Sequence, residues 1–129
     1  MPNLHSKIVN QDDKGIEIKI HNFNSIFSKK ECFYKIEIFN KNNFSINDIK
    51  IKLKYKENES IVEEIKSNET KIVEIPLYYE EIGNVKDVLE IKYNFSGKES
   101  IKTQRIDIKV EENKKDILNK KLKSSRTLL

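Results

Sequence analysis

The sequence is poor in several residue types, and each shortage excludes a class of protein. Cys32 is the only cysteine, so no intrachain disulfide can form and a disulfide-stapled scaffold is excluded. The three glycines lie far apart, which excludes the closely spaced glycines of P-loop and Rossmann nucleotide sites. No stretch reaches the ~18 apolar residues of a membrane span, and the N-terminus has no hydrophobic signal core. We therefore expect a cytoplasmic protein, and an extracellular one only if the native N-terminus is missing.

The composition favours strands over helices. Alanine, the strongest helix former, does not occur in the 129 residues, whereas β-branched isoleucine is abundant. This length suits one domain with its own core. Residues 1–110 are almost electrically neutral, with 19 Lys+Arg against 18 Asp+Glu, whereas residues 111–129 hold 6 against 3. The excess positive charge is therefore concentrated in the C-terminal segment.

Apolar and polar residues alternate through most of the chain, which is typical of half-buried strands. The connections between these strands are too short for the crossovers that join parallel strands. We therefore predict an all-β fold, an antiparallel immunoglobulin-like sandwich of seven to eight strands over residues 15–110. Residues 1–14 form an N-terminal arm that can hold one edge strand near residues 7–10, and residues 111–129 form a short basic helix or a disordered tail. The expected strands are 15–22, 32–40, 49–56, 61–66, 71–79, 87–95 and 101–110. The expected core is Ile16, Ile18, Tyr34, Ile36, Ile38, Ile51, Leu53, Ile91, Tyr93, Ile106 and Ile108.

The stretch "IKIKLKYK" (49–56) has a lysine at every second position. On a strand, these four lysines would project from one face, ~6.6 Å apart along the chain, above an apolar row that ends with Tyr55. The outer faces of the other predicted strands mix acids and bases, which favours a solvated face here too. A single-stranded nucleic-acid site would interleave aromatic residues on the lysine face, and Tyr55 has the opposite parity.

Two segments carry a resemblance to known families. "CFYKIEIFNKNNFSINDIKIKLKYK" resembles the strand, turn and strand of immunoglobulin-like modules of the adhesion-related (CARDB) and fibronectin III-like kind. It is also similar to one half of an arrestin or of a clathrin-adaptor appendage, and "EIPLYYEE" with "VLEIKYNFSGKES" continues the likeness, so that it covers roughly residues 15–110. The resemblance implies a binding or spacer module with no catalytic residues.

Residues that could support catalysis form no recognised motif. His5 and His21 lack cysteine or carboxylate ligands at metal-site spacing, so both are interpreted as surface histidines. Cys32 has no histidine at motif spacing, and its inward parity predicts a small buried hydrophobe. We therefore expect no enzyme activity, no cofactor and no metal.

The sequence predicts a non-enzymatic protein-interaction or structural module that binds a protein partner through an exposed sheet edge or face. The alternative is weak nucleic-acid or anionic-surface binding through the four lysines and the basic tail, although the nearly neutral body makes nucleic acid the less favoured partner. A thin apolar stripe in the tail also suits peripheral contact with a membrane. The sequence does not predict the oligomeric state. The candidate partner-binding residues are Lys50, Lys52, Lys54, Lys56, Ile117, Leu118, Lys120, Lys121 and Leu122.

Overall fold

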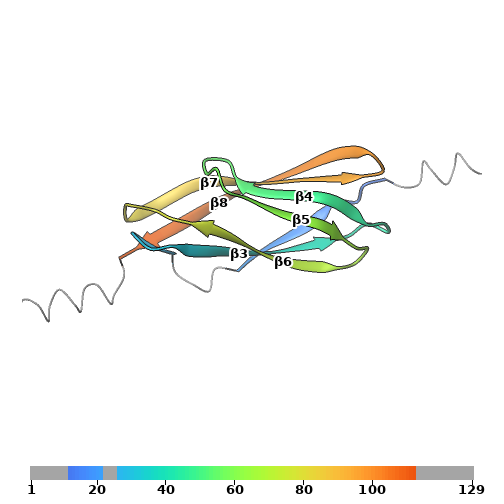
Figure 1. The fold of residues 1–129 in the computed structure, drawn as a ribbon. Helices are drawn as coiled ribbons and strands as arrows, with labels where there is room; N and C mark the ends of the chain where they lie inside the picture. The colour runs from blue at the N-terminus through green and yellow to red at the C-terminus, as the bar shows by residue number, and fades with distance from the viewer. Residues whose placement is uncertain (1–11, 22–25, 113–129) are drawn as a thin grey trace, which may run out of the picture.

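The computed structural model describes residues 12–21 and 26–112, where the regular structure consists of eight β-strands (Figure 1). This confirms the predicted all-β class. Within these two ranges, no helix has the length and apolarity needed to cross a membrane. The edge strand predicted near residues 7–10 lies outside the described residues, as does the helix or tail predicted over residues 111–129 except for its first two residues, of which Glu111 ends β8. The strands are β1 (Ile16–His21), β2 (Ile26–Phe27), β3 (Cys32–Asn40), β4 (Ile46–Leu53), β5 (Glu59–Ile65), β6 (Thr70–Leu77), β7 (Gly83–Phe95) and β8 (Lys98–Glu111).

The strands form two sheets that pack as a sandwich. Sheet A has three strands in the order β1-β3-β6, and sheet B has five in the order β2-β8-β7-β4-β5. All neighbouring strands are antiparallel except β2, which pairs in parallel with the end of β8. The chain crosses from one sheet to the other at five connections: β1 to β2, β2 to β3, β3 to β4, β5 to β6, and β6 to β7. This is the predicted antiparallel sandwich.

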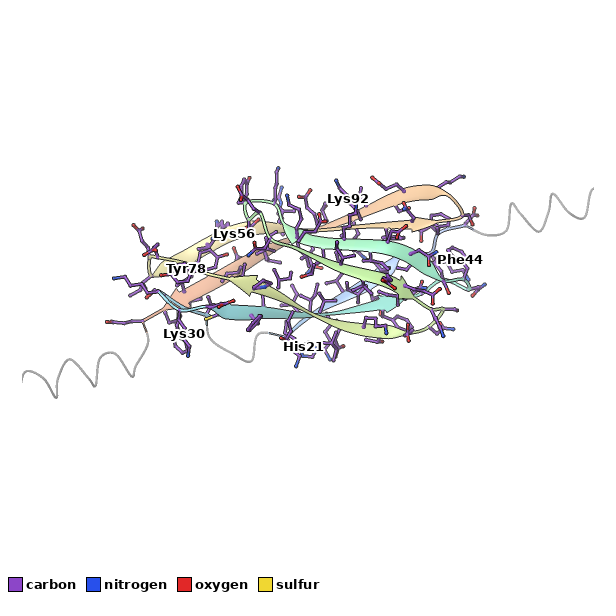
Figure 2. All side chains as sticks on the ribbon, in the orientation of Figure 1. His21, Lys30, Phe44, Lys56, Tyr78 and Lys92 are labelled. Carbon is purple, nitrogen blue, oxygen red and sulfur yellow. The ribbon has the colours of Figure 1, made fainter. Side chains whose placement is uncertain are left out.

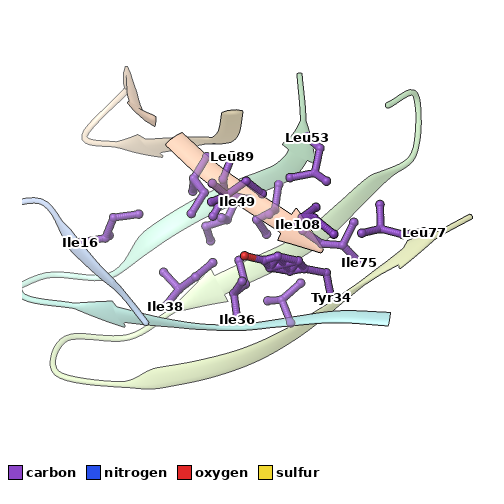
Figure 3. Close-up of a cluster of buried hydrophobic side chains, with 14 of the residues drawn as sticks. Ile16, Tyr34, Ile36, Ile38, Ile49, Leu53, Ile75, Leu77, Leu89 and Ile108 are labelled. Carbon is purple, nitrogen blue, oxygen red and sulfur yellow. The ribbon is translucent and has the colours of Figure 1, made fainter. Parts of the chain in front are cut away.

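The core fills the space between the two sheets. Side chains from sheet A, such as Tyr34, Ile36 and Ile75, face side chains from sheet B, such as Ile49 and Leu89 (Figure 3). Because side chains alternate across a strand, each sheet contributes every second residue and leaves polar residues outside. All the residues expected in the core are buried, except that Ile18 is only partly buried.

Several strand predictions are confirmed in detail. Strand β3 has the predicted bounds, and the polar segment 61–66 becomes the edge strand β5. Pro76, which cannot donate a ladder hydrogen bond, lies in the edge strand β6, as expected. Strand β2 was not predicted, because two residues are too few to show an alternation. The expected hairpin at "SGKES" joins β7 and β8 through Ser96 and Gly97, which both have the positive φ angles that a tight two-residue turn requires.

A buried asparagine pair closes the end of the sandwich where β3 turns toward β4. The side-chain amide of Asn40 donates to the carbonyl oxygens of Phe44 at 2.8 Å and Ile65 at 3.0 Å. Its oxygen accepts hydrogen bonds from the backbone N–H of Asn42 at 2.9 Å and from the Asn42 amide at 3.0 Å. Both asparagines are 0% exposed. This pairing lets polar groups remain in the core and fixes the turn.

Candidate interaction surface

A β-bulge in β4 decides which lysines lie together on the outer face of sheet B. Asp48 has a left-handed φ of 52°, and the pairing of β4 with β7 shifts register between Asn47 and Lys50. The extra residue lets Ile46 and Ile49, three positions apart, both point into the core at 0% exposure. Alternation is regular after Ile49, so Lys50 projects outward.

The strand predicted over residues 49–56 ends early, at Leu53. The backbone N–H of Lys54 donates to the carbonyl of Val88 at 2.9 Å, and the N–H of Tyr55 donates to the carboxylate of Asp87 at 3.2 Å. Asp87 is 4% exposed, so this buried acceptor fixes the turn beyond β4. Tyr55 was expected to face inward, and that expectation is wrong: its side chain is 69% exposed.

The early turn separates the four predicted lysines. Lys50 and Lys52 remain on β4, whereas Lys54 lies in the turn, with Nζ 5.6 Å from the ring centroid of Tyr55. Lys56 diverges further: its Nζ donates to the carbonyl of Tyr78 at 3.0 Å and lies 4.2 Å from the ring centroid of Tyr79. Figure 2 shows Lys56 beside Tyr78. The prediction of a single four-lysine row is therefore wrong.

A different row crosses the outer face of sheet B from edge to edge. In the strand register, Lys50 lies opposite Ile61 of β5 on one side and Lys92 of β7 on the other, and Lys92 lies opposite Ile101 of β8. We call Ile61, Lys50, Lys92 and Ile101 the Ile/Lys row. Both isoleucines are strongly exposed, at 66% and 56%, and Figure 2 shows Lys92 pointing away from the sheet. Directly opposite residues on one face have Cβ atoms ~5 Å apart, so the two lysines repel each other.

The adjacent row contains two carboxylates and one lysine, so its net charge is negative. Lys52 lies between Glu59 of β5 and Glu90 of β7, and Glu90 lies opposite Thr103 of β8. Because opposite charges face each other across strands, these contacts are attractive. Of the three lysines in these two rows, Lys50 and Lys92 are the ones with no carboxylate directly opposite.

Three members of the Ile/Lys row were missing from the sequence-based candidates. Ile101 has the outward parity of a strand whose inward residues are Ile106, Ile108 and Val110, a signal that the sequence does contain. Ile61 lies in a strand recognised as an edge, where outward apolar residues are harder to distinguish from core residues. The register that brings Lys92 beside Lys50 depends on the bulge, and nothing in the sequence pattern reveals it.

Other exposed apolar side chains are spread over other parts of the surface. Ile72 lies on the outer face of sheet A opposite Glu37, and Phe33 lies opposite Pro76 on the same face. Tyr78 and Ile82 are exposed in the connection from β6 to β7. None of these residues lies in a row with two lysines that face each other across strands. The Ile/Lys row is therefore the stronger candidate for an interaction surface.

The described side chains that could take part in acid–base or metal chemistry make contacts that support the fold. His21 Nε2 lies 2.8 Å from Glu37 Oε1, and the partly buried Cys32 packs against the core. Burial, with a contribution from the Asp87 charge, raises the pKa of Tyr79 to about 12. Among the residues described, no three His, Cys, Asp or Glu side chains are grouped to hold a metal ion. His5 and the predicted tail residues Ile117, Leu118, Lys120, Lys121 and Leu122 lie outside the described ranges.

Comparison with known proteins places the fold in a class. No family model matches the sequence, and no curated protein matches it. Among solved structures, the chain is similar to the ASH/PapD-like domain of human CEP192 (PapD-like domain 7), with a TM-score of 0.53 and 9% sequence identity. The match covers 76% of this chain and 86% of that one. The chain therefore has an immunoglobulin-like β-sandwich whose fold is similar to that of this PapD-like domain, whereas the more specific resemblance to CARDB or fibronectin III modules is not confirmed.

Proposed function

We propose that this chain is a non-enzymatic protein-interaction module, and that the Ile/Lys row of sheet B contacts an acidic segment of its partner. The single observation that carries the proposal is the direct opposition of Lys50 and Lys92 between two strongly exposed isoleucines. A PapD-like sandwich is compatible with this role.

The row has the chemistry of a small recognition surface. Like charges placed directly opposite each other destabilise a sheet, so the arrangement costs stability in the free protein. A carboxylate placed between Lys50 and Lys92 would relieve that repulsion, while apolar side chains on either side of it would cover Ile61 and Ile101. Apolar contacts beside a complementary charge supply both affinity and orientation.

Nucleic-acid binding is the competing function, and one observation favours it. Tyr55 is exposed beside Lys54, and an aromatic ring next to a basic side chain is a feature of single-strand binding. However, Glu59 and Glu90 flank Lys52 in the next row, so they would repel a continuous phosphate backbone, whereas a single carboxylate could lie between Lys50 and Lys92. We therefore rank a protein partner first.

Selection from a displayed library of random peptides tests the proposal. We expect the chain to enrich acidic peptides that also contain apolar residues. The double variant Lys50→Glu/Lys92→Glu should weaken binding of the selected peptides about tenfold or more, which is about 1.4 kcal/mol. A matched control, Lys19→Glu/Lys35→Glu, makes the same change in net charge on the outer face of sheet A. This control should still bind the selected peptides.

A second variant separates the two functions. The double variant Ile61→Ser/Ile101→Ser removes the apolar contacts and leaves every charge. It should therefore weaken binding of the selected peptides and leave binding of single-stranded DNA unchanged. The proposal fails if no acidic peptide is enriched, if the sheet A control loses binding equally, or if DNA binds more tightly than any selected peptide at physiological salt.

A further inference from the structure

A hollow lies on the outer face of sheet B, beyond the point where β4 ends. The pairing of β4 with β7 stops at Leu53 and Leu89, whereas β7 and β8 stay paired as far as Gly83, so their outer face is open there. The hollow has a volume of about 410 Å³. Tyr55, from the connection between β4 and β5, lines one part of it. The outward side chains that line it are Lys86 and Val88 of β7 and Arg105 and Asp107 of β8.

Hydrogen bonds hold the turn that carries Tyr55 against β7. The N–H of Lys56 donates to the carbonyl of Leu53 at 3.0 Å and closes the turn. The buried carboxylate of Asp87 accepts both the N–H of Tyr55 and, at 2.6 Å, the N–H of Val88. Figure 1 shows this connection beside β7. The backbone of Tyr55 is therefore fixed while its ring is strongly exposed, so a ligand that contacts the ring has little ordering cost to overcome.

The charges that line the hollow leave one guanidinium without a partner. Lys86 lies opposite Asp107, so these two opposite charges face each other, whereas Arg105 lies opposite Val88. Among the described residues, the Arg105 side chain forms no hydrogen bond or ion pair. A guanidinium stacks on aromatic faces, and a tyrosine ring packs against a second ring in offset or edge-to-face geometry. The hollow therefore suits an aromatic side chain better than a carboxylate, which Asp107 would repel.

The hollow lies at a fixed spacing from the Ile/Lys row. Val88 comes four residues before Lys92 on β7, and Arg105 comes four residues after Ile101 on β8, so the register keeps both strands in step. Four residues of a strand rise about 13 Å. An extended peptide above β7 rises by the same amount and turns every second side chain toward the sheet. Its side chains at alternate positions would meet the Ile/Lys row, then the row that contains Glu90, then the hollow.

We propose that the hollow beside Tyr55 receives an aromatic side chain of the partner's acidic segment. This side chain lies four positions along an extended chain from the carboxylate that contacts Lys50 and Lys92. The inference rests on the proposed function and adds a sequence pattern to it. The side chain midway between the two faces Glu59 and Glu90, so a basic residue fits there. The recognised pattern is thus an acidic, a basic and an aromatic residue at alternate positions.

Titration of the whole chain with short synthetic peptides, followed by NMR, tests the proposal. The matching peptide has aspartate, lysine and tryptophan at its second, fourth and sixth positions in a chain of eight residues that otherwise contains serine. One control peptide has the tryptophan at the seventh position, where it turns to the other side, and a second control has serine in place of tryptophan. Each peptide is also made in the reverse order, because the register leaves the direction of the bound chain open.

We expect the matching peptide, in one of its two orders, to bind about tenfold more tightly than both controls. It should shift the amide signals of Val88 and Arg105 together with those of Lys50 and Lys92. The two control peptides should shift mainly the signals of the two lysines. This comparison uses the unmodified chain, so it does not depend on the folding of any variant.

Two variants locate the aromatic contact. Tyr55→Ser/Arg105→Ser should lower the affinity for the matching peptide to that of the serine control peptide and leave the affinity for the control peptide unchanged. The matched variant Tyr78→Ser/Lys19→Ser also removes one exposed ring and one exposed cation, but from other parts of the surface. It should bind the matching peptide as the unmodified chain does.

Each other outcome overturns the inference. Equal affinity for all three peptides, with Lys50 and Lys92 still shifting, would overturn it and leave the proposed function standing, as would unchanged binding by Tyr55→Ser/Arg105→Ser. If no peptide shifts the two lysines, the proposed function itself fails, and the inference fails with it. A matching peptide that shifts Val88 and Arg105 without the lysines would show that the hollow and the Ile/Lys row do not bind one peptide together.

Discussion

Replacing Asn40 with alanine should destabilise the fold far more than its polar character suggests. The substitution removes the donor for the Ile65 carbonyl and the acceptor for the backbone N–H of Asn42, and both of these bonds are fully buried. Each buried group left without a partner costs about 1–3 kcal/mol, so the two together cost about 2–6 kcal/mol. The bond to the Phe44 carbonyl is only partly buried, and water can replace it.

Urea unfolding followed by far-UV circular dichroism measures this loss. Asn43→Ala is the matched control, because Asn43 is an exposed asparagine of the same turn and its loss should cost less than ~0.5 kcal/mol. Asn40→Leu keeps most of the volume but not the hydrogen bonds, and it should be almost as harmful as the alanine variant. If Asn40→Ala and Asn40→Leu both cost under ~1 kcal/mol, the network does not hold this end of the sandwich together.

Three further predictions follow from the same structure. Lys92→Glu should stabilise the free protein by about 0.2–1 kcal/mol by removing the repulsion with Lys50, and the gain should shrink at high salt; a loss of stability at low salt would contradict this. Burial opposes ionisation of Asp13, but hydrogen bonds from Tyr93 and other groups outweigh it and hold the pKa of this carboxyl below its ordinary value of 3.8. These hydrogen bonds therefore stabilise the fold above pH 3.8, and the stabilisation is lost as the pH falls through the lowered pKa. Tyr93→Phe should therefore flatten the decline in unfolding free energy with acid, and an unchanged slope would show that the contact is not maintained in solution. Ile36→Ala should cost about 2–5 kcal/mol by urea unfolding, and less than ~0.5 kcal/mol would mean that Ile36 is not in the core.

The alternation of apolar residues was enough to predict most of the fold. Strand β3 was recovered at both ends, because a polar turn bounds each side of an uninterrupted alternation. Burial followed the same parity, which is why Ile36, Ile91 and Ile108 were placed correctly in the core. Ile18 deviates because it lies in β1, an edge strand of sheet A, and parity alone does not distinguish an edge strand from a central one.

The candidate surface was harder to predict than the core, because it depends on register. Parity says which face of a strand a residue occupies, but only the pairing says which residues of other strands lie beside it. The bulge at Asp48 and the turn held by Asp87 together change the neighbours of the lysines. As a result, Lys54 and Lys56 leave the predicted row, while Lys92, from a strand about forty positions later, joins Lys50.

The same reasoning explains why the free protein can carry an unfavourable surface. Core residues are constrained by parity, since a slip of one position would expose a whole row of isoleucines. The outer face has no such constraint, so the sheet tolerates the Lys50 and Lys92 pair for a few tenths of a kcal/mol while the buried face fixes the register. In the proposed interaction, a partner that supplies a carboxylate would recover this energy on binding. The Ile/Lys row is thus held in place by core packing that does not depend on it, and substitutions in this row should change the proposed recognition without unfolding the sandwich.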